Sequence, residues 1–223
     1  MSRIKQISAS LFASDILYLG NNISALNNTD IDSFHIDIMD GHFVPLYGFN
    51  NIWIREIKTA AEKPIDIHLM TEITKNQFYS VISLMPSLIS IHLEAMNERK
   101  TAEYMEEIRK HGIKAGIAIK PCTVVSAIAP YMSMIDDVLV LSTEPGTENS
   151  IFLKESFGRI ANLRRLINSA CENVTISVDG ALSRSYAGKC FEYGADRCVM
   201  GRSLFASSDI PSLLYDLKNG IPI

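Results

Sequence analysis

The chain has 223 residues, of which 47% are hydrophobic and 21% are charged, and its formal net charge is −4 at pH 7. This length and composition are typical of one globular domain, and the scattered Lys and Arg residues form no basic stripe, so we expect no nucleic-acid partner. No segment approaches the roughly 20 apolar residues that span a bilayer, and residues 1–10 lack the apolar core of a secretory signal, so we expect a cytoplasmic protein with no membrane partner.

Short apolar runs alternate with amphipathic stretches along the whole chain. The expected strands are residues 4–10, 34–40, 64–70, 88–95, 113–119, 137–143, 174–180 and 197–201, and two clear helices are residues 51–62 and 101–112. Strands alternating with helices indicate βαβ units and a parallel sheet. Eight such units predict a (β/α)₈ barrel (a TIM barrel) that occupies residues 1–223 as a single domain. A doubly wound open sheet is the competing fold, but no GxGxxG motif follows the first strand.

Polar residues recur inside these expected strands, where burial is costly unless a partner is present. Because strand side chains alternate between faces, the polar residues and methionines that share a face can be grouped in chain order: Ser8 and Ser10; His35, Asp37 and Met39; Asp66, His68 and Met70; Ser90, His92 and Glu94; Ser177 and Asp179. In a barrel of this type the active site lies at the C-terminal ends of the strands, which is where these residues fall.

A metal site is the functional interpretation of four of them: His35, Asp37, His68 and Asp179. Imidazole and carboxylate are good ligands for first-row divalent ions. We expect one ion per subunit, Zn²⁺ first, with Fe²⁺, Mn²⁺ or Co²⁺ as alternatives. The competing interpretation is that each residue is a separate buried polar group satisfied by hydrogen bonds. His92 is expected either to bond to a neighbour or to touch substrate.

The carboxylates indicate the reaction. A metal that holds two adjacent substrate oxygens acidifies the carbon–hydrogen bond between them. Asp37 and Asp179 come from strands far apart in the barrel order, so they can flank a substrate and transfer protons at its two faces. Met39 and Met70 point into the same space and would cap the intermediate and exclude water, although filling the core is the alternative role for each methionine.

These motifs resemble the ribulose-phosphate 3-epimerase family. The resemblance runs from "ISASLFASD" to "GADRCVMGRSLF" and includes "HIDIMDGHFVP", "DIHLM", "HLEA", "EPG" and "VDG" in the family's order. It implies a (β/α)₈ barrel that epimerises a ketose phosphate at carbon 3. The substrate would be ribulose 5-phosphate, or a related pentulose or hexulose phosphate such as allulose 6-phosphate. It also implies a cytosolic homo-oligomer, a dimer or a hexamer.

For individual residues, the resemblance implies His35, Asp37, His68 and Asp179 as metal ligands, with Asp37 and Asp179 as the acid–base pair. Ser10 matches a substrate-contacting Ser. The expected substrate-binding residues are Ser10, His68, His92, Gly146, Gly180, Gly201, Arg202 and Ser203.

The departures from the family gather where the family binds the phosphate. Glu148 and Asn149 replace two glycines, Ser150 replaces a Gln, Ala181 replaces a Gly, and Arg202 follows Gly201. Leu46 and Leu141 stand where the family has an Asn and a third capping Met. Side chains at glycine positions block close approach of the backbone.

Two cations have open roles in this region. Arg202 is expected to begin a short helix, where it either binds the phosphate or pairs with Glu148 or faces solvent. Lys120, where the family has Asn, is expected either to contact substrate or to face solvent.

Three other functions compete with this hypothesis: a non-catalytic sugar-phosphate-binding barrel, an epimerase of a differently substituted ketose, and another metal-dependent reaction such as that of an isomerase or an aldolase. The strand interiors contain no Schiff-base Lys candidate, which argues against an aldolase of that type.

Overall fold

The structure is a computed structural model that describes residues 4–147, 150–170 and 172–220. The described residues form a closed barrel of parallel strands in the order β1-β2-β3-β4-β5-β6-β7-β8. Their bounds are β1 Gln6–Ser10, β2 Ser33–Met39, β3 Ile65–Met70, β4 Leu88–His92, β5 Lys114–Ile119, β6 Asp137–Leu141, β7 Thr175–Asp179 and β8 Arg197–Met200. The (β/α)₈ prediction is therefore confirmed, and the doubly wound alternative is wrong because β8 pairs with β1.

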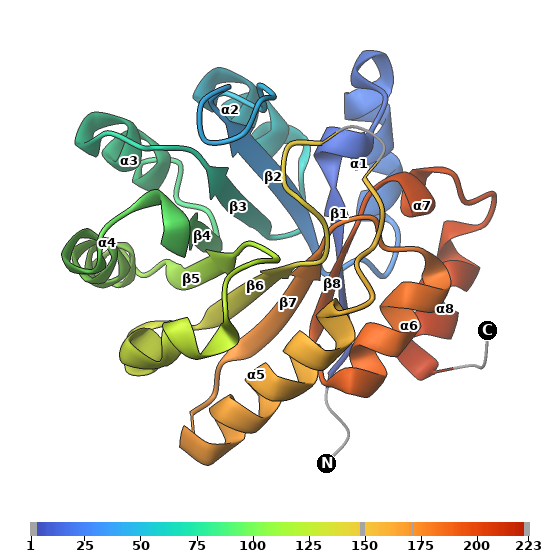
Figure 1. The fold of residues 1–223 in the computed structure, drawn as a ribbon. Helices are drawn as coiled ribbons and strands as arrows, with labels where there is room; N and C mark the ends of the chain where they lie inside the picture. The colour runs from blue at the N-terminus through green and yellow to red at the C-terminus, as the bar shows by residue number, and fades with distance from the viewer. Residues whose placement is uncertain (1–3, 148–149, 171, 221–223) are drawn as a thin grey trace.

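Helices surround the strands, as Figure 1 shows. They are α1 Leu19–Asn27, α2 Asn51–Ala60, α3 Lys75–Ile82, α4 Glu98–Lys110, α5 Ser156–Ala170, α6 Arg184–Tyr193, α7 Arg202–Phe205 and α8 Ile210–Asn219. The shorter 3₁₀ segments are η1 Leu11–Ala13, η2 Ile16–Tyr18, η3 Leu93–Ala95 and η4 Val125–Met134. Among the described helices, none combines the length and the apolar composition that a membrane crossing requires.

Local sequence explains where several of these helices begin. The side chain of Asn50 accepts hydrogen bonds from the first backbone amides of α2, and Thr74 and Gln77 form a capping box at α3. The crossover between β5 and β6 contains η4, which includes Pro130. Proline lacks the backbone N–H that a helix interior uses and its ring clashes with the preceding turn of an α-helix, so a regular α-helix is disfavoured there.

The main core lies between the strands and the helices and consists mostly of Ile, Leu, Val and Phe. Inside the barrel the filling is different. A small apolar cluster from β5, β6 and β8 (Ala118, Leu139, Leu141 and Val199) is separate from the main core. Buried polar residues, Ser8, Asp66, Asp137 and Ser177 among them, also face the interior. The polar faces predicted for the strands therefore meet one another inside the barrel.

The predicted strand bounds differ from the observed ones by one to three residues, and the largest error is at the fourth strand. The fourth strand ends at His92, and residues 93–95 form η3 instead of continuing the strand. Glu94 therefore does not share a strand face with His92, yet its carboxylate still lies 2.9 Å from the His92 ring.

Candidate active site

Four acidic and imidazole side chains converge at one end of the barrel interior. His35 and Asp37 lie on β2, His68 lies on β3 directly opposite Asp37 in the register, and Asp179 ends β7. One ligand-type atom from each residue lies within 4.8 Å of the others. Asp37 Oδ1 is 3.3 Å from His35 Nε2 and 3.1 Å from His68 Nδ1. The structure thus brings together the residues that the sequence predicted as ligands.

These atoms fit a divalent metal ion. His35 Nε2 is buried and has no hydrogen-bond partner among the described residues, which is costly for a nitrogen that no ligand binds. The distances of 3.3 and 3.1 Å approach the edge of about 3.3–3.4 Å that a tetrahedron has when its ligands lie about 2.0–2.1 Å from Zn²⁺. Two imidazoles and two carboxylates form a donor set typical of Zn²⁺ or another first-row ion.

The two carboxylates differ in their electrostatic surroundings. Burial and the negative charge of Asp37 raise the pKa of Asp179 to about 6. Burial also acts to raise the pKa of Asp37, but the neighbouring His35 and His68 outweigh it and lower that pKa well below its usual range. The pair therefore holds one proton at Asp179 more readily than at Asp37.

Asp66 supports His35 from behind. Burial opposes the charged form of His35, but the carboxylates of Asp66 and Asp37 outweigh it and raise the pKa of the imidazole. His35 Nδ1 hydrogen-bonds Asp66 Oδ1, and Asp66 Oδ2 accepts hydrogen bonds of 2.8 Å from the hydroxyls of Ser8 and Ser33. The sequence placed Asp66 on the right face and assigned it no role.

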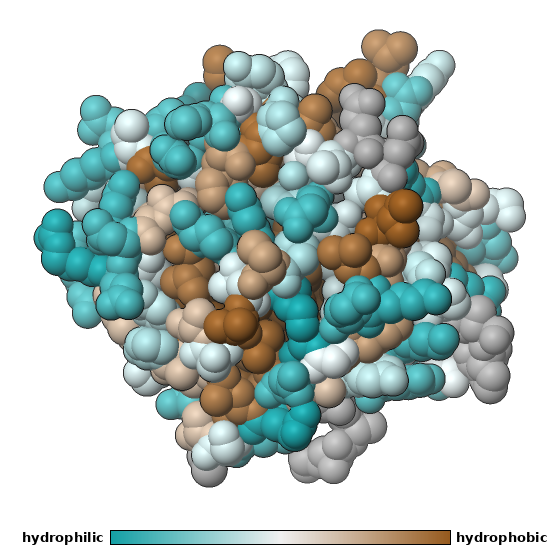
Figure 2. All heavy atoms as spheres, viewed as in Figure 1, coloured by the Kyte–Doolittle hydropathy of each residue, from teal (hydrophilic) through white to brown (hydrophobic). Residues whose placement is uncertain are grey.

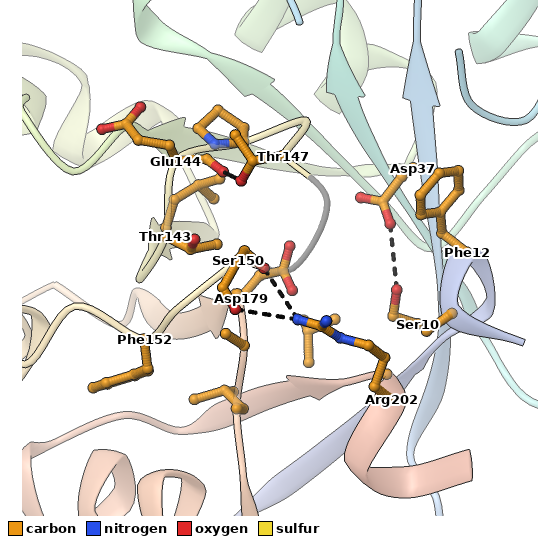
Figure 3. Close-up of a pocket in the computed structure, with 18 of the residues that line it drawn as sticks. Ser10, Phe12, Asp37, Thr143, Glu144, Thr147, Ser150, Phe152, Asp179 and Arg202 are labelled. Carbon is orange, nitrogen blue, oxygen red and sulfur yellow. Dashed lines mark hydrogen bonds between the residues drawn. The ribbon is translucent and has the colours of Figure 1, made fainter. Parts of the chain in front are cut away.

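A cavity of about 480 Å³ opens beside this cluster and is lined by both Asp37 and Asp179. Figure 3 shows the two carboxylates coming from different strands, with Ser10 next to Asp37. The Ser10 hydroxyl donates to Asp37 Oδ2 at 3.3 Å. Figure 2 shows hydrophilic and hydrophobic side chains intermingled on the face that Figure 1 presents.

Apolar side chains form one wall of this cavity. Met39 and Met70 both line it, together with Leu46 and Leu141. Met39 and Met70 also pack with Val44 in a small separate cluster, and Leu46 packs against this cluster. The structure therefore places both predicted capping methionines beside the carboxylates; their capping role stays a prediction.

The residues of the predicted phosphate corner line the same cavity. Gly146, Gly180, Gly201, Arg202 and Ser203 all line the cavity. Two of these glycines have positive φ, 69° at Gly146 and 118° at Gly180, and a Cβ there would lie 2.5 Å from Val44 Cβ and 2.4 Å from Thr143 Cγ2. Packing of the surrounding loops thus already requires glycine at both positions.

The residues in this corner that differ from the family's are described by their backbone conformation and their hydrogen bonds. Ala181 keeps a left-handed backbone with φ of 50°, a conformation that glycine adopts more readily. Arg202 begins α7, and its Nη2 donates hydrogen bonds of 3.2 Å to the backbone oxygen and the hydroxyl of Ser150 (Figure 3). Ser203 donates its hydroxyl proton to the Leu182 carbonyl. Glu148 and Asn149, and with them the expected pairing of Arg202 with Glu148, lie outside the described residues.

Lys120 contacts an aromatic side chain. Its ammonium lies 3.8 Å from the ring centroid of Phe43, a cation–π contact, and its backbone N–H donates to Glu94. Lys120 is not among the residues lining the cavity. Contact of Lys120 with substrate stays a prediction.

His68 and His92 also lie away from the cavity wall. Their exposed fractions are 0% and 1%, and neither lines the cavity. His68 lies between Asp37 and His92, and His92 lies between His68 and Glu94. Of the two alternatives for His92, the structure shows the bond to a neighbour.

Several cavity residues were missing from the sequence-based predictions. Thr143 and Glu144 follow β6, and the rule that active sites lie after barrel strands points to them. Phe12 and Tyr186 also line the cavity, but they come from a 3₁₀ segment and a helix, and no local pattern distinguishes them from ordinary packing residues.

Comparison with known proteins points to one family. The sequence profile described as "Ribulose-phosphate 3 epimerase family" matches residues 6–205. The chain is 30% identical over 216 residues to the ribulose-phosphate 3-epimerase of Aquifex aeolicus, which covers 97% of this chain and 96% of that one. It is 28% identical over 212 residues to the chloroplastic ribulose-5-phosphate-3-epimerase of Arabidopsis thaliana, with 95% and 75% covered.

Solved structures show the fold alone. Orotidine 5'-phosphate decarboxylase from Pyrococcus horikoshii OT3 matches with a TM-score of 0.68 and 12% identity over 97% of this chain and 99% of that one. The tryptophan synthase α-subunit from Pyrococcus furiosus matches with a TM-score of 0.65 and 17% identity over 99% and 97%.

Proposed function

The chain belongs to the ribulose-phosphate 3-epimerase family, and on that premise we propose that it inverts carbon 3 of a ketose phosphate by proton transfer between two carboxylates. It is a carbohydrate epimerase of the isomerase class that acts on ketose phosphates. The observation that carries the two-base proposal is the pair Asp37 and Asp179, which reach one cavity from β2 and β7 beside two buried histidines.

The proposed metal ligands are His35, Asp37, His68 and Asp179, whose atoms fit one divalent ion. We propose Zn²⁺ first, with Fe²⁺, Mn²⁺ or Co²⁺ as alternatives, because nitrogen and oxygen donors accept all of these ions. When bound, the ion would polarise the substrate oxygens next to carbon 3 and stabilise the ene-diolate charge.

Asp37 and Asp179 would exchange the proton. Inversion requires one carboxylate to be ionised when the other is protonated, since one removes a proton and the other supplies one. Ser10 holds Asp37 Oδ2 by a hydrogen bond. Met39 and Met70 would exclude water, which protects the intermediate from stray protonation.

Arg202 is the proposed phosphate ligand. It lines the cavity and is exposed, and its guanidinium is held by Ser150 at 3.2 Å. Arginine binds phosphate through paired donors, and the cavity of about 480 Å³ lies in the usual range of about 300–1,000 Å³ for small-molecule sites.

A pentulose phosphate, ribulose 5-phosphate, is the first substrate candidate because the relatives carry that name. A hexulose phosphate such as allulose 6-phosphate is the second. The bond from Arg202 to Ser150 favours it, because it changes the phosphate corner at the position where Ser150 replaces the family's Gln. A homo-oligomer, dimer or hexamer, and a cytoplasmic location stay predictions.

Solvent deuterium exchange at carbon 3 tests the chemistry without assuming the product. The screen follows exchange by NMR over pentulose and hexulose phosphates and their free sugars. Asp37→Asn and Asp179→Asn should each abolish exchange, whereas Asp30→Asn at an exposed site should leave it unchanged. Near-normal exchange in either active-site variant would show that the two-base mechanism is wrong.

Arg202→Ala tests the phosphate ligand. A charge-assisted hydrogen bond is worth about 1.5–3 kcal/mol, so the KM for the ketose phosphate should rise at least roughly tenfold, with little change for a free sugar. Arg165→Ala, at another exposed arginine, is the matched control. An unchanged KM in Arg202→Ala would remove Arg202 from the site.

A further inference from the structure

The His68 ring makes a hydrogen-bond contact with His92, a residue that has no role in the proposed proton transfer. His68 Nδ1 lies 3.1 Å from Asp37 Oδ1, on the side of the metal ligands. Its other nitrogen, Nε2, lies 2.9 Å from Nε2 of His92. Two ring nitrogens at hydrogen-bond distance require that one carries the proton and the other accepts it. The direction of this bond decides which nitrogen of His68 has a free lone pair.

Glu94 sets that direction. Its Oε2 lies 2.9 Å from His92 Nδ1, and its Oε1 accepts hydrogen bonds from the backbone N–H of Lys120, at 2.8 Å, and from the hydroxyl of Thr123. A carboxylate held by such donors can only accept. His92 Nδ1 therefore carries a proton and donates it to Glu94, which leaves His92 Nε2 as the acceptor.

The same reasoning extends to His68. Because His92 Nε2 accepts, His68 Nε2 carries the proton and donates it. In a neutral imidazole the lone pair then lies on Nδ1, the atom that faces Asp37. The His35 ring is held directly by a carboxylate. Its Nδ1 donates to Asp66, so the lone pair lies on Nε2, the atom that faces Asp37. Each histidine of the cluster is thus held from behind by a buried or half-buried carboxylate.

We propose that Glu94, acting through His92, is a positioning residue that holds His68 in the tautomer and orientation in which Nδ1 binds the metal. The inference rests on the proposed metal centre and adds two residues to it. The His92 ring cannot easily turn away, because it is buried and packs against Phe43 with ring centroids 4.8 Å apart. The opposite tautomers would place a proton on His68 Nδ1 and block the ligand position.

Zn²⁺ affinity, measured by competition with a chelator, tests this arrangement. In Glu94→Gln the side-chain NH₂ replaces one carboxylate oxygen. This NH₂ then faces either His92 Nδ1–H or the backbone N–H of Lys120, and one of these two hydrogen bonds is lost. His92→Phe leaves His68 Nε2–H without an acceptor. Both should weaken Zn²⁺ binding about 10- to 100-fold, as loss of a partner behind a ligating histidine typically does. His92→Gln, whose amide oxygen can accept from His68, should recover most of the affinity.

Thr123→Val is the matched control, because it removes one donor to Glu94 and leaves the bond to His92 in place. It should change Zn²⁺ affinity less than threefold. The visible spectrum of bound Co²⁺ should change in Glu94→Gln and His92→Phe and stay unchanged in Thr123→Val. A general loss of protein stability would not change the spectrum of the bound ion in this selective way. Equal Zn²⁺ affinity in the wild type and both disrupted variants would overturn the proposal.

The tautomers can also be read directly by ¹⁵N NMR of the Zn²⁺-loaded wild type, so the test does not depend on any variant folding. The expected result is a proton on His92 Nδ1 and on His68 Nε2. A proton on His92 Nε2 would overturn the proposal. A wild type that binds no Zn²⁺ would overturn the metal centre itself, whereas tight binding with the wrong tautomers would refute only the role of Glu94 and His92.

Discussion

Replacing Asp137 by Asn should stabilise the protein, and the gain should grow with pH. Asp137 begins β6, faces the barrel interior and is 2% exposed. Its Oδ1 accepts a 2.6 Å hydrogen bond from Ser177 and lies 3.7 Å from Arg197 Nη1, while its Oδ2 has no partner among the described residues. Burial raises the pKa of Asp137 to about 6, although Arg197 opposes the rise.

The magnitude follows from linkage between proton binding and folding. Because the folded pKa is higher than the unfolded value of 3.8, the folded state binds the proton more tightly. Stability is therefore fully retained below pH 3.8 and falls as the pH rises from 3.8 to 6. At about 1.36 kcal/mol for each pH unit, the ionised carboxylate costs about 3 kcal/mol above pH 6. Asn resembles the protonated acid, keeps an acceptor for Ser177 and avoids this cost.

Urea unfolding at pH 8 and pH 4.5 measures the effect. The free energy of unfolding of Asp137→Asn should exceed that of the wild type by about 3 kcal/mol at pH 8 and by about 1 kcal/mol at pH 4.5. In thermal unfolding, the gain at pH 8 corresponds to roughly 6–12 °C. Asp30→Asn, at an exposed site, should change neither value. A variant less stable than the wild type at pH 8, or a gain that does not vary with pH, would refute the reasoning.

Three further predictions concern the active site and its surroundings. Asp66→Asn should weaken Zn²⁺ binding about 10- to 100-fold in chelator competition, because it removes the carboxylate behind His35; unchanged affinity would contradict this. Ala181→Gly should change the free energy of unfolding by about 0 to +1 kcal/mol, since relief of the left-handed backbone exceeds the added freedom of the unfolded chain; a loss above about 1 kcal/mol in urea unfolding would contradict it. Chelation should lower the Tm of the wild type, because a ligand of the native state stabilises it, and should leave an Asp37→Asn/Asp179→Asn variant unaffected.

Much of this architecture was predictable from local sequence. The two-residue period of strands placed His35 and Asp37 on one face, and the rule for strand ends placed Asp179 at the mouth of the barrel. The convergence of His35, Asp37, His68 and Asp179 followed because the face on which each side chain lies depends only on its own strand. The barrel itself followed from the alternation of strands and helices, and the structure confirms it.

Contacts between strands and loops could not be predicted in the same way. Glu94 was placed on a strand, but the chain turns into η3 there, and its carboxylate reaches His92, Thr123 and the backbone of Lys120. The Lys120 side chain contacts Phe43, which lies far earlier in the sequence. Sequence periodicity does not encode these contacts, because they depend on how neighbouring loops fold over the end of the barrel.

The sequence by itself therefore determined the fold class and the chemical types of the site residues, since both follow from periodicity and residue chemistry along single strands. Only the tertiary structure decided the orientation of these side chains and the pKa values of their carboxyl groups. The orientation of His68 depends on a bond to His92 on the adjacent strand, and the pKa difference between Asp37 and Asp179 depends on charges from three strands in one buried space. Hydrogen bonding and electrostatic interaction act through distance in space, and the closed barrel sets those distances.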